Sequence, residues 1–130
     1  MTIYNAKDCI ITFNNIVITG VGEDMVSGEK DEDNFETTVG AQGDVAVSEV
    51  NDSLGTITLT LLPNSPQKAM LIDACNNGTV APMWVKNPSI GERFGGTQAR
   101  IMKVPTSDHG KTVSSREFQI KVFDYRLENI

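Results

Sequence analysis

Alternating apolar and polar residues run through most of the chain and predict β-strands. In residues 55–62, Ile57, Leu59 and Leu61 lie on one side of an extended chain and threonines lie on the other. Such alternation of apolar and β-branched residues is typical of a strand with one buried face. Similar patterns predict strands in the segments CIITFNNIVITG, FETTVGAQGDVAVSEV, VAPMWVKN, TQARIMKV and VSSREFQIKVFDYRL.

Turn-forming residues indicate where these strands end. Asn14 and Asn15 predict a hairpin between two short strands, or a bulge in a single strand. Residues 40–43 contain two glycines and predict the turn of a second hairpin. Pro82 marks an edge or a bulge, because proline cannot donate a ladder hydrogen bond. Residues 88–96 are predicted to form a loop.

The C-terminal segment is predicted to be the longest strand. Phe118, Ile120 and Val122 share one face of it. The apolar phase slips between Val122 and Phe123, after which the alternation continues in the new phase.

One segment departs from the strand pattern and predicts a helix. Ser65 precedes Pro66, and a serine N-cap followed by proline at the first helical position is a typical helix start. Asn77 and Gly78 predict the end, because glycine tolerates the left-handed conformation found there. Ile72 lies on the polar face, which indicates an exposed aliphatic residue or a contact with a second surface. The apolar face of this predicted helix consists of Met70, Leu71, Ala74 and Cys75.

Together these elements predict a single antiparallel β domain over residues 1–130. The expected fold class is mainly β, a β-sandwich or barrel with one flanking α-helix. No apolar stretch approaches the roughly twenty residues that span a bilayer, and the N-terminus predicts no secretion signal. Cys9 and Cys75 are therefore expected as buried thiols and not as a disulfide.

The negative charge of the chain is concentrated in one segment. The net charge is −6; residues 20–36 contain seven acidic residues and one lysine, and the rest of the chain holds ten residues of each sign. Low hydrophobicity, dense charge and three glycines predict a long, flexible acidic loop at about residues 20–36. The charged residues of this predicted loop are Glu23, Asp24, Glu29, Lys30, Asp31, Glu32, Asp33 and Glu36.

No group of residues has the composition of a catalytic or cofactor site. His109 is the only histidine, and its sequence SDHG is ordinary turn chemistry. One histidine and two distant cysteines do not provide a zinc site. The segment DEDNFETTVG lacks the glycine and closing glutamate of a calcium loop, and GERFGG lacks a phosphate-binding lysine. We therefore predict no enzyme activity, no cofactor and no metal, and we expect Trp84 in the core.

Three short segments follow one another between the acidic segment and the predicted helix. They are GAQGDV at residues 40–45, NDSLGTITLTL at residues 51–61, and Ser65-Pro66. In this order of elements the chain resembles the tail tube proteins of contractile-tailed bacteriophages, and the likeness covers most of its length. Type VI secretion tube proteins are similar in fold.

The resemblance implies a structural, self-assembling subunit. In this family, hexameric rings join part of each sheet into a continuous barrel around a channel, and the rings stack into a tube that carries DNA. The implied partners are further copies of the chain, a surrounding sheath, a baseplate and a tail-terminator protein, with no membrane partner. DNA is expected to pass without sequence-specific binding, since the sequence has no basic stripe with aromatic residues. The implied location is the virion tail, assembled in the host bacterial cytoplasm.

The resemblance also gives the acidic segment an expected role. In the family, the long loop after the first strands reaches the adjacent ring, and residues 20–35 occupy that position here. The predicted loop is expected to dock on a neighbouring ring or to face the channel, and Ile72 is a candidate subunit contact. The bases that would receive a docked loop are Arg93, Arg100, Lys103, Lys111, Arg116, Lys121 and Arg126.

Two other functions fit the sequence. One is a monomeric β-sandwich that binds a sugar or a protein, which needs an exposed aromatic platform, although only 6% of the residues are aromatic. The other is a tube subunit of a phage-derived particle or a type VI-like secretion system.

Overall fold

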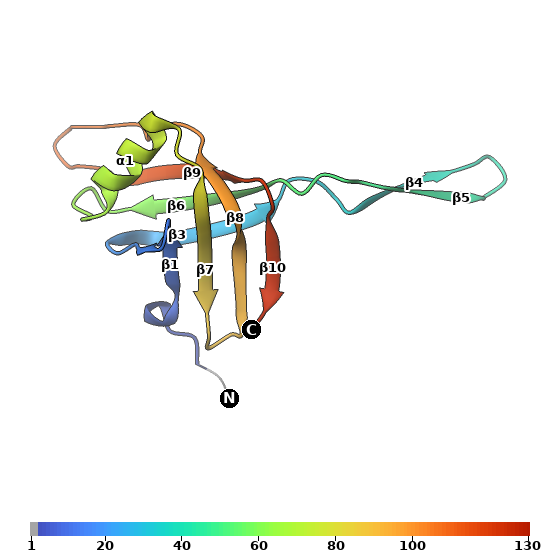
Figure 1. The fold of residues 1–130 in the computed structure, drawn as a ribbon, viewed down its shortest axis with the longest axis horizontal. Helices are drawn as coiled ribbons and strands as arrows, with labels where there is room; N and C mark the ends of the chain where they lie inside the picture. Colours follow the sequence, from blue (N-terminus) through green and yellow to red (C-terminus); the bar gives the residue numbers. More distant parts are fainter. Residues whose placement is uncertain (1–2) are drawn as a thin grey trace.

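A computed structural model describes residues 3–130 as two crossing β layers with one helix and one projecting hairpin (Figure 1). Within these residues, eight strands form an antiparallel sheet in the order β2-β1-β7-β8-β9-β6-β3, with β10 paired to β8, and β4 pairs with β5 alone. The elements are a short 3₁₀ helix Ala6–Asp8, β1 (Ile10–Phe13), β2 (Ile16–Val17), β3 (Val21–Lys30), β4 (Phe35–Val39), β5 (Val45–Glu49), β6 (Gly55–Leu61), α1 (Lys68–Asn77), β7 (Ala81–Asn87), β8 (Glu92–Ile101), β9 (Arg116–Val122) and β10 (Arg126–Asn129).

The long strand β8 joins the two layers. Its first residues pair with β10 and its last residues pair with β9, so its neighbour on one side changes in the middle of the strand. In Figure 1, β1, β7, β8 and β10 run upright, and β9, β6 and β3 cross them. Crossing layers of this kind are typical of orthogonally packed sheets. The predicted fold class, mainly antiparallel β with one flanking helix, is confirmed.

The core lies between the layers and consists of their inward-facing side chains. Ile57, Leu59 and Leu61 of β6, with Phe118 and Ile120 of β9, are completely buried, as the alternation predicted. Each fully buried side chain of this size contributes about 1.5–3 kcal/mol relative to an exposed one. The upright layer contributes Ile11, Phe13, Met83 and Val85.

The hairpin predicted at Asn14 and Asn15 and the irregularity predicted at Pro82 are both confirmed. Asn14 and Asn15 have φ angles of 52° and 63°, which is the combination that a two-residue type I′ hairpin turn needs between β1 and β2. The register of β7 against β8 shifts between Ala81 and Met83, because Pro82 of β7 lies opposite two residues of β8, Thr97 and Gln98, which form a bulge.

Two predicted boundaries are wrong. β8 begins at Glu92, inside the predicted loop at residues 88–96, because this stretch is paired by β7 on one side and by β10 on the other. The predicted C-terminal strand is two strands, since the chain turns at Phe123 and Asp124, next to the phase slip. The slip therefore marks the point where the chain leaves β9 and returns along β8.

The helix end is confirmed and the predicted start is wrong. α1 begins at Lys68 rather than at Ser65, whose hydroxyl donates to the Thr19 carbonyl at 2.6 Å. The side-chain oxygen of Gln67 accepts from the backbone and the hydroxyl of Thr19, each at 2.9 Å. The Ser65 and Gln67 side chains thus bind the segment before the helix to Thr19, just after β2, and do not cap the helix. Gly78 ends the helix with φ 67°.

α1 covers one end of the core. Leu71 is completely buried, and Ile72 is half-buried and packs against the core of the same chain. The apolar character of Ile72 is thus explained without a second subunit. Cys9 and Cys75 are free, as predicted, but they are half-buried rather than fully buried.

The predicted acidic loop at residues 20–36 is wrong. Residues 21–30 form the strand β3, which pairs with the central strand β6, and residues 35 and 36 already belong to β4. Composition predicted flexibility, but pairing with a strongly apolar strand orders this segment while its acidic side chains face solvent. A bulge at residues 22–25 is the main irregularity, and Met25 there has φ 50°.

Candidate assembly interface

One edge of β3 is unpaired within the described part of the chain, because β3 is the last strand in the sheet order. The amide of Asp31 donates to the Leu54 carbonyl at 3.0 Å. Successive residues of an antiparallel strand direct their backbone groups to opposite edges. The amides of Val26, Gly28 and Lys30 therefore point away from β6. A row of unpaired backbone groups is a template for pairing with another chain.

Two shorter strands provide further open edges. Within residues 3–130, β2 pairs only with β1, and β10 pairs only with β8. Ile16 and Val17 of β2 and Leu127 of β10 are exposed apolar residues. Apolar side chains gathered beside open edges are typical of surfaces that another molecule covers.

β4 and β5 form a hairpin that extends far from the two layers (Figure 1). All ten residues of these two strands are exposed. The Gly40 amide donates to the Asp44 carbonyl at 2.7 Å, and Gly43 has φ 92°, which confirms the turn predicted at residues 40–43. We call residues 35–49 the arm. A two-stranded hairpin without further cover is only marginally stable in water.

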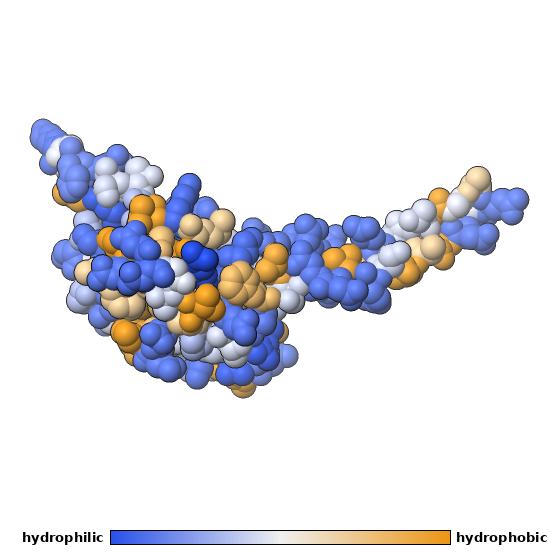
Figure 2. All heavy atoms as spheres, turned by 45° about the horizontal axis from the view of Figure 1, so that its top comes forward, coloured by the Kyte–Doolittle hydropathy of each residue, from blue (hydrophilic) through white to orange (hydrophobic). Residues whose placement is uncertain are grey.

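The arm has one apolar face. Its register places Phe35 opposite Glu49 and Val39 opposite Val45, so these side chains share a face. Apolar side chains are visible along the projecting hairpin in Figure 2. The sequence predicted both strands but not that this face is uncovered. The alternation in FETTV and VAVSE does indicate that the apolar residues of each strand share one face. The apolar face consists of Phe35, Val39, Val45 and Val47, each more than half exposed.

Hydrogen bonds fix the root of the arm to the body. The Asp31 carboxylate accepts from the Lys121 ammonium and, at 2.8 Å, from the Thr56 hydroxyl. On the other side of the root, the Ser53 hydroxyl donates to the Phe123 carbonyl at 2.7 Å. The hydrogen bonds from Lys121 and Thr56 hold the pKa of Asp31 below its ordinary value of 3.8.

Replacing Asp31 by asparagine should lower the free energy of unfolding by less than about 1 kcal/mol at neutral pH, because the ion pair is partly exposed. Since the folded-state pKa is lowered, this stabilisation exists above pH 3.8 and is lost as the pH falls through the folded-state pKa. Urea unfolding of the wild type and Asp31→Asn from about pH 7 to about pH 3 measures the difference. A difference that did not shrink at acidic pH would contradict the assignment.

The predicted acidic residues are spread over three elements and do not form one loop. All are exposed, and among them only Asp31 forms an ion pair within residues 3–130. The other carboxylates are therefore available to a second molecule, whereas the Lys30 ammonium donates to the Asn34 side chain. These carboxylates belong to Glu23 and Asp24 in the β3 bulge, Glu29 beside Lys30 at the end of β3, Glu32 and Asp33 in the connection, and Glu36 on the polar face of the arm.

The prediction that Arg116 is a basic partner for a neighbouring subunit is wrong. Its side chain is only 3% exposed, and its guanidinium donates to the Ser114 carbonyl at 2.9 Å and the Asp108 carbonyl at 3.5 Å. The alternation of β9 places position 116 in the inward row with Phe118. Arg116 thus holds the loop before β9 in place and is not available to a neighbour.

Two further candidates are engaged at Trp84, which is half-buried on the outer face of β7 rather than in the predicted core position. The guanidinium carbon of Arg93 lies 4.5 Å from the ring centre and that of Arg126 lies 5.4 Å from it. Arg93 also pairs with Glu128 at 2.6 Å. Lys121 is held by Asp31, so among the predicted basic partners the exposed ones without an ion pair in the described residues are Arg100, Lys103 and Lys111.

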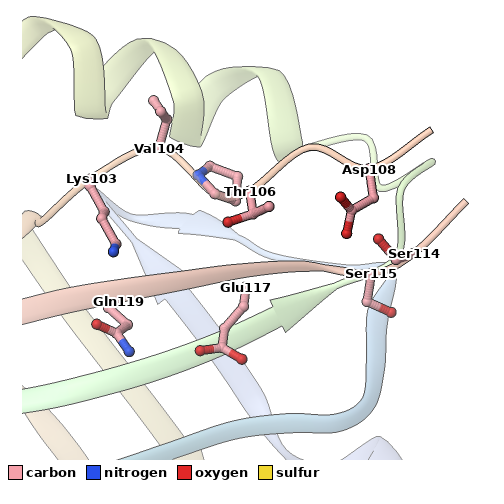
Figure 3. A pocket seen from close by; sticks show the side chains of 9 residues that line it. Lys103, Val104, Thr106, Asp108, Ser114, Ser115, Glu117 and Gln119 are labelled. Carbon is pink, nitrogen blue, oxygen red and sulfur yellow. The ribbon is translucent and has the colours of Figure 1, made fainter.

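A polar cavity of about 290 Å³ lies between the loop before β9 and the β9 strand (Figure 3). Lys103, Asp108, Ser114 and Glu117 are among the residues that line it, but His109 is not. The Ser114 hydroxyl accepts a hydrogen bond from the Arg116 guanidinium at 3.4 Å. The described residues contain no cluster of three potential metal ligands, and none of their helices is long and apolar enough to cross a membrane.

Open strand edges and an uncovered projecting arm are typical of structural proteins whose surfaces are covered on assembly. The sequence agrees, since residues 11–125 match the bacteriophage PhiTE tail tube protein family. The chain therefore belongs to this family of phage tail tube proteins. No curated protein sequence matches it.

Solved structures of contractile injection systems share the fold. A chain of the PVC sheath/tube terminator in the extended state matches with a TM-score of 0.69 and 12% identity, over 98% of both chains. A chain of the PVC sheath-tube complex matches with a TM-score of 0.64 and 13% identity, over 94% of this chain and 88% of the other. The tube-terminating cap of the anti-feeding prophage matches with a TM-score of 0.60 and 12% identity, over 100% of this chain and 93% of the other.

Proposed function

We propose that this tail tube protein assembles by strand pairing between subunits into hexameric rings, which stack into a tube around a channel for DNA. The unpaired edge of the ten-residue strand β3 carries this proposal. Lateral addition of a neighbour's strand satisfies backbone groups that are otherwise exposed. The open edges of β2 and β10 offer further strands for such pairing.

The remaining features support the same assembly. The exposed apolar face of the arm gives each subunit a contact that reaches beyond its own ring. The net charge of −6 disfavours retention of DNA, which needs basic contacts to its phosphates. A sheath, a baseplate and a tube terminator are the expected partners, and the host bacterial cytoplasm is the expected place of assembly.

The direction of the β3 backbone gives a test of edge pairing. Lys30→Pro removes an amide that points away from β6, so the monomer should fold normally while ring formation weakens by about 1–3 kcal/mol per contact. Glu29→Pro is the matched control, because it removes an amide that faces β6 and should destabilise the monomer itself. Urea unfolding and size-exclusion chromatography separate the two effects; a Lys30→Pro protein that assembles normally would exclude this edge from the interface.

Negative-stain microscopy of the purified chain tests the assembly as a whole. Rings or rods of uniform width support the proposal, and a protein that stays monomeric at every concentration and with added baseplate contradicts it. A second candidate is the tube of a phage-derived injection particle, because the similar structures come from PVC and the anti-feeding prophage. Particles isolated from the producing cells distinguish the two by the presence or absence of packaged DNA.

A further inference from the structure

The apolar face of the arm has no cover from residues 3–130 of its own chain. The arm projects away from the two layers (Figure 1), and every residue of β4 and β5 is exposed. Glu49 lies on this face, directly opposite Phe35. The surface that covers the arm must therefore offer apolar contacts and a positive charge on another molecule.

One shallow depression on the body has this composition. Its volume is about 370 Å³, and its lining residues are Arg100, Ile101, Met102, Lys121 and Phe123. Met102 is 52% exposed and Phe123 is 37% exposed. Arg100 is exposed and has no ion pair among the described residues, so its guanidinium is free to donate to a carboxylate.

Other depressions on the body have a charge that does not suit the arm. The polar cavity of Figure 3 contains one ammonium, that of Lys103, and two carboxylates, those of Asp108 and Glu117. A smaller depression beside Cys9 contains Glu92. Both would place a carboxylate near the acidic arm, which is unfavourable.

We propose that the apolar face of the arm docks in the Arg100–Met102–Phe123 depression of a second copy of the chain. Val47 packs against Met102 and Phe123, and Glu49 pairs with Arg100. Each copy supplies one arm and one depression, so the contact is heterologous and propagates through an assembly. The inference rests on the proposed self-assembly and names the surface that receives the arm.

Disulfide trapping tests the contact in assembled protein. In a Cys9→Ala, Cys75→Ala background, Val47→Cys with Met102→Cys should form intermolecular disulfides in rods under mild oxidation. Ser48→Cys with Met102→Cys is the matched control, because residue 48 lies on the opposite face of the arm. We expect at least about tenfold more cross-linking at position 47, since proximity raises the effective concentration. Equal cross-linking at both positions would overturn the docking face.

A charge exchange tests the ion pair without cysteines. Arg100→Glu should raise the concentration needed for assembly by about tenfold, because it meets Glu49 with like charge. Adding Glu49→Arg should restore assembly, whereas adding Glu36→Arg, on the polar face of the arm, should not. Failure of Glu49→Arg to restore assembly would overturn the pairing.

The outcomes separate this inference from the proposed function. Rods that form without the 47–102 disulfide overturn the docking site and leave the tube intact. Disulfides formed equally by Val47→Cys alone show that two arms pair with each other, which also overturns it. A background protein that never assembles contradicts the proposed function itself.

Discussion

Replacing residues 35–49 by a two-residue Asn-Gly turn should give a folded monomer that no longer forms tubes. The replacement closes cleanly, because the Val50 amide already donates to the Asn34 carbonyl at 2.9 Å. All residues of β4 and β5 are exposed, so the body loses no core contact and its free energy of unfolding should change by less than about 0.5 kcal/mol. The proposed apolar contact between subunits would be lost completely.

Urea unfolding, size-exclusion chromatography and negative-stain microscopy measure these effects on one preparation. Two point variants give a graded version of the experiment. Val47→Ser places a polar group on the apolar face and should weaken assembly, whereas Ser48→Ala changes the opposite face and should not. Tubes of normal length from the shortened protein would show that the arm has no part in assembly.

The sequence predicted the parts of this fold that depend on neighbouring residues. The alternation in β6 gave its buried face, because Ile57, Leu59 and Leu61 face the core whichever strands lie beside them. The turn residues Asn14, Asn15 and Gly78 were also sufficient, since their backbone angles are a local property. The fold class followed from these elements together.

The sequence could not predict which strands pair, and the errors follow from this. Residues 21–30 are acidic enough to indicate a loop, but pairing with β6 makes them a strand. Arginine is usually a surface residue, but the alternation of β9 places Arg116 on the inward face. There its guanidinium donates to the backbone carbonyl of Ser114. Conversely, the arm has the alternation of a packed strand, but nothing in the described part of the chain covers it.

Gly95 is the position where a single methyl group should have the largest effect on the body. It lies in β8 between Trp84 of β7 and Arg126 of β10, close to where β8 changes its neighbour from β10 to β9. Its φ angle is 134°, and a Cβ atom there would lie 2.0 Å from the carbonyl oxygen of Met83. Glycine therefore allows the close approach of β7 and β8 on which the joining of the two layers depends.

Gly95→Ala should reduce the free energy of unfolding by at least about 3 kcal/mol. The strained backbone conformation alone costs about 1–3 kcal/mol, and relieving the contact with Met83 requires β7 and β8 to separate. Since small domains are stable by only about 5–15 kcal/mol, we expect a melting temperature lower by about 10 °C or more, or insoluble protein. Thermal unfolding followed by circular dichroism measures this loss.

Gly40→Ala is the matched control for this prediction. Its Cβ atom would lie 3.7 Å from the nearest atom, the Asp44 carbonyl oxygen, which is an ordinary contact. Its free energy of unfolding should stay within about 0.5 kcal/mol of the wild type. The fluorescence of Trp84 provides a second measurement, because this side chain lies directly opposite Gly95 and should change only in Gly95→Ala. Equal stability of the two variants would show that β7 and β8 tolerate a wider separation and that the joining of the layers does not depend on Gly95.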